Sequence, residues 1–174
     1  STTHIRANNE HTDWKDIRLY IETFRKQNLN FLEILFTDYK MLNKDYEGFW
    51  KILECNREGI AHMNPHRAVK SMQHIAKEKY HAMCHPYPSK LEILEKYGYD
   101  GKQVHHLLRV EDYIERYIAG EEYGKCLKPT PEKVPRMMDY KALDKIPLKE
   151  AEEEAEASLE RMDIMAARFC ADCE

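Results

Sequence analysis

Residues 99–120 constrain the fold more than any other stretch, because they carry the signals of one helix with a defined start and end. Asp100 is a favoured N-cap residue, and Gln103, three positions later, suits a capping box. Gly120 suits the left-handed turn that ends a helix. Apolar residues recur between them at intervals of three and four: Val104, Leu107, Leu108, Ile114 and Ile118. This spacing predicts an amphipathic helix with one buried face.

The other long segments show similar helical spacing. Helices are expected from about residue 13, over 46–63, from Pro65 to about Met83, over 89–97 and over 148–169, with Asn64-Pro65 as a strong helix start. Charged residues make up 33% of the 174 residues, and six glycines and seven prolines punctuate them sparsely. We therefore predict an all-α fold, a single helical domain of about seven helices over residues 13–174, with no substantial sheet.

Residues 1–12 are polar and are predicted to be irregular. Such a start resembles a cut inside a longer polypeptide more than a natural N-terminus. We therefore expect a further segment upstream of Ser1.

Composition narrows the function classes. A net charge of −4 and a pI near 6.2 argue against a general nucleic-acid binder, although local basic faces are compatible with them. No apolar run is long enough to cross a membrane, and no signal-peptide pattern opens the chain. Five scattered cysteines fit reduced thiols in a cytoplasmic protein better than a disulfide framework.

Histidines and cysteines do not form a metal-binding pattern. Cys170 and Cys173 make a lone C-x-x-C without a second pair, whereas structural zinc needs four ligands. His81, Cys84 and His85 lie close together but without the Glu of an H-E-x-x-H motif. We expect ordinary surface histidines and predict no metal site.

Two helices carry rows of cationic side chains opposite their apolar faces. At about 100° per residue, Lys102, His106 and Arg109 fall within roughly 60° of one another. The helix after Pro65 carries a second set: Arg67, Lys70, His74 and Lys77. Such rows either face solvent or bind a phosphate or carboxylate. Glu111 falls within the apolar arc, so it either pairs with a cation or marks a different helix orientation.

The sequence of residues 96–109 resembles that of a known family. Tyr-Asp-x-Lys-x-x-x-His-x-x-Arg, after a Lys-Tyr-Gly turn, is similar to the C-terminal helical region of predicted nucleotidyltransferases of the DNA polymerase β superfamily. The likeness continues over 16–20, 25–37, 46–53, 64–65 and 97–128, and the last 40 residues match loosely. Its specificity lies in several blocks in the same order rather than in one diagnostic motif.

The resemblance implies that these helices sit beside a catalytic sheet, near substrate. Nucleotidyl transfer needs cations that balance triphosphate charge and position the pyrophosphate leaving group. Lys102, His106 and Arg109 could form one side of such a site and the cationic set after Pro65 another, provided that the two helices pack with their rows converging. Implied for the parent enzyme are Mg²⁺ and a nucleoside triphosphate, an upstream catalytic domain or chain as partner, and a nucleotide or RNA as ligand.

The catalytic signature of that family is absent from this chain. It consists of a Gly-Ser turn followed by paired aspartates that bind two metal ions. None of the six glycines is followed by Ser, no Asp-x-Asp occurs, and only Asp13 is a weak match to the third carboxylate. We therefore expect the chain alone to be inactive and to bind no cofactor by itself, and its catalytic residues are not assigned.

Two other functions fit the same residues. Helical domains that accompany minimal nucleotidyltransferases cleave RNA without metal through an Arg, four to six residues, then a His. Arg67 and His74, with six residues between them, could be such a pair. Alternatively, the chain is a structural or dimerising helical module, and both rows face water.

Overall fold

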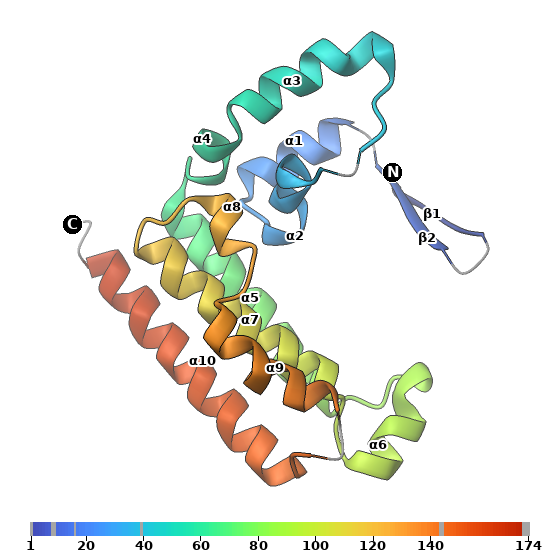
Figure 1. The fold of residues 1–174 in the computed structure, drawn as a ribbon, viewed down its shortest axis with the longest axis vertical. Coiled ribbons are helices and arrows are strands. Elements are labelled where there is room, and N and C mark those ends of the chain that lie inside the picture. The colour runs from blue at the N-terminus through green and yellow to red at the C-terminus, as the bar shows by residue number, and fades with distance from the viewer. Residues whose placement is uncertain (1, 8–9, 16, 39, 143–144, 172–174) are drawn as a thin grey trace. The chain divides into compact units, whose positions relative to one another are not determined.

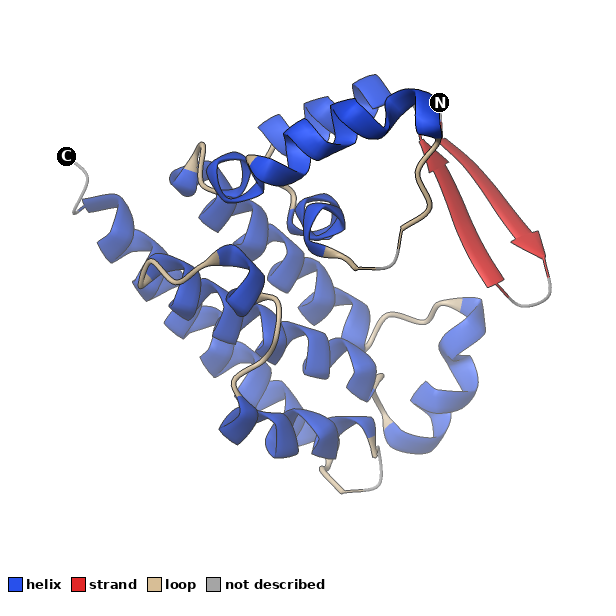
Figure 2. Cartoon of the chain, turned by 45° about the horizontal axis from the view of Figure 1, so that its top comes forward, coloured by secondary structure: helices blue, strands red, loops and turns tan. Residues whose placement is uncertain are grey.

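The computed structural model describes residues 2–7, 10–15, 17–38, 40–142 and 145–171 (Figure 1). The chain divides into two compact units, residues 1–68 and 69–174, and each is described by itself. Helices make up almost all of the regular structure in the described residues (Figure 2). The predicted all-α class is therefore confirmed, with one small hairpin and no substantial sheet.

The first unit opens with a β-hairpin, so the prediction of an irregular segment over residues 1–12 was wrong. Strands β1 (Thr2–Ala7) and β2 (Glu10–Lys15) pair antiparallel, with Thr3 opposite Trp14 and Ile5 opposite Thr12. These β-branched and aromatic residues alternate along each strand and favour extended structure. The first helix consequently begins at Ile17 rather than at residue 13.

Short helices complete this unit: α1 (Ile17–Arg25), α2 (Leu29–Leu32), η1 (Glu33–Phe36), η2 (Lys44–Tyr46), α3 (Glu47–Cys55) and α4 (Arg57–Ala61). Phe24, Leu32 and Leu35 are buried in its core. Gln27, buried and at a positive φ of 52°, donates from Nε2 to the carbonyls of Phe24 and Ile60, both at 2.8 Å. This side chain therefore ties the end of α1 to α4.

The second unit is built around α7 (Gly101–Ile118). Its other elements are α5 (Pro65–Met83, whose first turn lies in the first unit), η3 (Pro88–Lys90), α6 (Leu91–Tyr97), α8 (Tyr123–Cys126), η4 (Pro131–Lys133), α9 (Val134–Lys141) and α10 (Leu148–Ala171). In Figure 1, α9 and α10 both lie beside α7. Because α7 is covered on several sides, it supplies much of the unit's core, including the buried Leu107, Tyr113 and Ile114.

Helix α7 begins and ends where the sequence predicts. The Asp100 side chain accepts a hydrogen bond from the Lys102 amide at 3.1 Å and another from Gln103 Nε2 at 3.2 Å. At the other end, Gly120 has a φ of 81° and donates to the Tyr117 carbonyl, while Glu121 donates to Arg116. This pair of bonds is the Schellman pattern, which satisfies carbonyls that the helix end leaves free.

Glu111 pairs with a cation, which resolves its position in the apolar arc of α7. Its carboxylate accepts hydrogen bonds from Ser158 Oγ and from Arg161 Nε and Nη2, all on α10. The bonds link α7 to α10 at a point where an apolar residue would be expected. Burial of the carboxylate is thereby compensated.

Gly98 ends α6 in the left-handed conformation, which is unfavourable for residues that have a Cβ. Gly98→Ala is therefore expected to destabilise the protein by about 2 kcal/mol. Its φ is 83°, and an added Cβ would lie 3.1 Å from Leu148 Cδ2. Gly120→Ala is the matched control, because φ is 81° but nothing lies within 4 Å of the added Cβ. Urea unfolding should show the larger loss for Gly98→Ala, and equal losses would mean that the contact with Leu148 costs nothing.

Candidate functional site

The cationic side chains singled out from the sequence lie on two helices. Those of α7, called the α7 row, are Lys102, His106 and Arg109, and those of α5, called the α5 row, are Arg67, Lys70, His74 and Lys77. The three side chains of the α7 row differ in exposure. Lys102 is exposed, whereas His106 and Arg109 are half-buried. Arg109 donates from Nη2 to the Leu127 carbonyl at 2.9 Å, just after α8. Arg109 therefore has a structural role and still presents part of its guanidinium to the surface.

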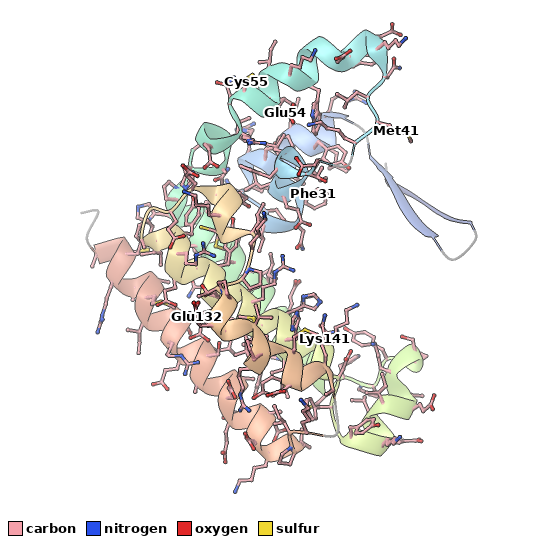
Figure 3. The ribbon with its side chains drawn as sticks, in the orientation of Figure 1. Phe31, Met41, Glu54, Cys55, Glu132 and Lys141 are labelled. Carbon is pink, nitrogen blue, oxygen red and sulfur yellow. The ribbon has the colours of Figure 1, made fainter. Side chains whose placement is uncertain are left out.

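Cations from two other helices join this row. Lys79 of α5 and Lys102 both act electrostatically on His106, while Lys141 of α9 acts on His105 and Arg109 acts on both rings. Figure 3 shows Lys141 at the C-terminal end of α9. We call this set the cation surface: Lys79, Lys102, His105, His106, Arg109 and Lys141. Within the described part of the chain, no carboxylate pairs with Lys79, Lys102, Arg109 or Lys141.

The two histidines lie at the centre of the cation surface. Their ring centroids are 5.5 Å apart in an edge-on arrangement, and His105 Nδ1 lies 3.0 Å from the Met137 carbonyl oxygen. Burial lowers the pKa of His106, and the positive side chains around it lower it further, to about 4. Burial and the same cationic surroundings also lower the pKa of His105. Both rings are therefore neutral near pH 7. The positive charges around them have no carboxylate partner in the described residues and would attract an anion.

The structure does not bring the α5 row together with the α7 row. Lys77 Nζ lies 3.5 Å from Asp163 Oδ1 of α10, so this row faces the α10 side of α5. Lys79, two residues later and about 200° around the helix, is the α5 cation that acts electrostatically on His106. The convergence of the two rows, on which a site formed by both of them depends, is thus not observed within the described part of the second unit.

The remaining members of the α5 row are exposed: Arg67, Lys70 and His74. His74 Nε2 lies 3.4 Å from Glu78 Oε1 on the same helix. Arg67 belongs to the first unit, and its amide donates to Asn64 Oδ1 as part of the helix cap. Arg67 and His74, the pair on which the RNA-cleavage alternative depends, thus fall on different sides of the boundary between the two units, although both belong to α5.

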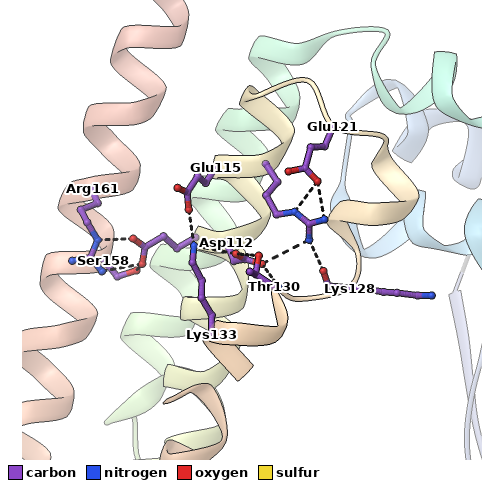
Figure 4. A network of polar contacts seen from close by, with 10 residues as sticks. Asp112, Glu115, Glu121, Lys128, Thr130, Lys133, Ser158 and Arg161 are labelled. Carbon is purple, nitrogen blue, oxygen red and sulfur yellow. Dashed lines mark hydrogen bonds and ion pairs between the residues drawn. The ribbon is translucent and has the colours of Figure 1, made fainter. Parts of the chain in front are cut away.

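A second polar cluster fastens residues 127–133, the connector, to α7 (Figure 4). Asp112, whose side chain is 1% exposed, accepts bonds from the Thr130 amide at 2.9 Å and hydroxyl at 2.7 Å, and pairs with Lys133 Nζ at 3.0 Å. Burial alone would raise the pKa of Asp112, but the bonds from Thr130 and Lys133 outweigh it and lower the pKa. Arg116 donates to the Lys128 carbonyl at 2.6 Å and to Glu121. These groups satisfy one another and serve to hold the connector.

A groove of about 290 Å³ lies next to this cluster, between α7, α9 and α10. Its three cations all have carboxylate partners: Lys133, Arg136 and Arg161. The groove is therefore close to electrically balanced. It therefore has less unpaired positive charge with which to bind an anion than the cation surface has.

The described part of the chain has the features of neither a metal site nor a membrane span. No group of three or more His, Cys, Asp or Glu side chains there could hold a metal ion. The cysteines that are described, Cys55, Cys84, Cys126 and Cys170, are not in disulfide bonds, whereas Cys173 of the C-x-x-C lies outside the described residues. None of the described helices combines the length and apolar character of a membrane span.

Sequence reasoning missed Lys79, His105 and Lys141. Lys79 lies off the α5 row, His105 lies beside the α7 row, and Lys141 follows the proline-containing connector. Helical spacing locates the face of a helix but not the helix that packs beside it, so these three residues gave no separate signal.

Comparison of the chain with protein-family models, curated proteins and solved structures gives no match. The geometry of the cation surface is therefore the main guide to function.

Proposed function

We propose that this chain is the helical, substrate-side part of a polymerase-β-like nucleotidyltransferase and that its cation surface binds the phosphates of a nucleotide or RNA. The observation that carries the proposal is the gathering of Lys79, Lys102, Arg109 and Lys141 around two neutral histidines, with no carboxylate partner among the described residues. Exposed cations usually alternate with acids, as in the α5 row with Glu78 and Asp163. A cluster without acids favours a multiply charged anion.

The chemistry of this family needs a charged triphosphate to be held while its pyrophosphate leaves. Lysine and arginine side chains stabilise that charge in position. The cation surface offers three helices from which such contacts could come, with Arg109 oriented by the Leu127 carbonyl. These residues would bind and orient phosphate, and no bond-making step is assigned to them.

Mg²⁺, which the resemblance implies for the parent enzyme, does not fit the carboxylates near this surface. Asp112, the most buried carboxylate of the described part of this unit, already accepts bonds from Thr130 and pairs with Lys133. No group of described residues offers the clustered oxygen ligands that Mg²⁺ prefers. The metal-dependent step would therefore belong to the upstream catalytic domain or chain.

Binding of inorganic triphosphate to the whole chain tests the proposal. Replacing Lys79, Lys102 and Lys141 singly with Gln is expected to weaken binding about threefold each, and the triple variant more than tenfold, since each removes one positive charge at or near the surface. Isothermal titration calorimetry at low salt measures this, and added salt should weaken wild-type binding. Arg109→Ala should weaken it more, but that variant also loses the bond to Leu127.

Two controls make the test specific. Lys149→Gln, on α10 with its side chain 88% exposed, removes an equal charge away from the surface and should leave the affinity unchanged. The double variant Lys70→Gln/Lys77→Gln removes two cations of the α5 row and should also bind normally. Equal affinities for the wild type and the triple variant would refute the phosphate-binding role.

A further inference from the structure

The centre of the cation surface contains a group that is able to gain a proton. His105 is fixed by its contact with the Met137 carbonyl, and because that oxygen can only accept, Nδ1 of His105 carries the hydrogen. His106 makes no such bond within the described residues, and its ring is half-buried beside His105. His106 can therefore change its protonation without breaking a contact that holds the helices together.

The groups that face the two rings are mostly positive, whichever element they come from. Lys79 of α5 and Lys102 and Arg109 of α7 act electrostatically on His106, and Lys141 of α9 acts on His105. With the surface empty, a proton on His106 would meet only like charges and a partly buried environment. A bound phosphate with two or more negative charges reverses that balance, because it neutralises the lysines and offers oxygen acceptors to the ring.

We propose that the cation surface binds a multiply charged phosphate group together with one proton, which His106 takes up from the solvent. The inference rests on the proposed function and adds the ligand's chemical class: a terminal phosphate dianion or polyphosphate chain rather than a monoanionic phosphodiester. A phosphodiester carries one charge per phosphate and compensates the four cations less completely. Proton uptake and anion binding then strengthen each other by the same factor, as linkage requires.

The test follows the imidazole resonances of His106 by NMR between about pH 4 and pH 8, with and without inorganic triphosphate, and assigns them with His106→Gln. The pKa of about 4 in the free protein should rise to about 6 in the saturated complex. Such a rise makes binding at pH 5 about tenfold tighter than at pH 8. Because triphosphate itself titrates, the comparison is the excess of the wild type over His106→Gln in calorimetry.

The outcomes separate the two proposals. Triphosphate binding with an unchanged His106 titration would overturn the proton uptake and leave the phosphate-binding role standing. Failure of the wild type to bind at any pH would overturn both. If His106→Gln does not fold, as judged by circular dichroism, the wild-type titration alone decides, and single His→Gln replacements of the other eight histidines identify the His106 resonances by elimination.

Discussion

Asp112→Ala is expected to lower the free energy of unfolding by about 3 kcal/mol, because it removes the acceptor from a buried charge pair. The side chain is 1% exposed and accepts both bonds from Thr130, as well as pairing with Lys133. Its loss leaves the Thr130 amide and hydroxyl without that acceptor and opens a space beneath the connector. Asp112→Asn keeps an oxygen for Thr130 and should lose roughly half as much.

Urea unfolding followed by far-ultraviolet circular dichroism measures this loss. Asp139→Ala is the matched control, because Asp139 also pairs with a lysine, Lys145, at 2.7 Å but with its side chain 38% exposed. Such a surface pair should contribute less than about 1 kcal/mol. Both tryptophans, Trp14 and Trp50, lie in the first unit, so their fluorescence shows whether that unit is affected. Equal losses for the two aspartate variants would contradict the role given to Asp112.

The second large effect is a pH dependence of stability that depends on His106. Its pKa is about 4 in the folded protein, against an ordinary value of 6.5. Between these values the unfolded chain binds the proton more strongly, so stability is greatest above about pH 6.5 and falls as the pH drops towards 4. Allowing for partial solvent screening, the loss amounts to about 2–3 kcal/mol over that window.

His106→Gln should remove the fall in stability between pH 8 and pH 5 that His106 causes. The wild type should therefore lose more unfolding free energy than the variant when the pH is lowered from 8 to 5. Unfolding free energies at both pH values measure the effect. His81→Gln, at an exposed site on α5, serves as the control and should keep the wild-type slope. A wild-type slope that survives in His106→Gln would show that the titrating group lies elsewhere.

Local signals along the chain predicted much of the helical fold. Asp100 caps α7, Gly120 ends it, and Asn64 with Pro65 opens α5, because each device depends only on neighbouring backbone groups. The hairpin was missed because its polar composition outweighed the alternation of Thr3, Ile5, Thr12 and Trp14. The proline-containing segment forms η4 and the start of α9, with Pro131 and Pro135 in first-turn positions that tolerate proline.

Helical spacing in the sequence predicted only part of the candidate site. Lys102, His106 and Arg109 share one helix, so periodicity alone places them on one face. Lys79 of α5 and Lys141 of α9 act on the two histidines of α7 from other parts of the chain, and such interactions between distant segments leave no mark on local spacing. The same cause explains the α5 row, whose partner Asp163 is 86 residues from Lys77 along the chain.

The connector matters to anyone who divides this chain into fragments. Its prolines invite a truncation, yet the carbonyls of Leu127 and Lys128 and both donors of Thr130 are bonded to α7. A fragment ending there would lose α9 and α10 and uncover the apolar side of α7 that they shield. The smallest piece of this unit that keeps its core must therefore run through α10.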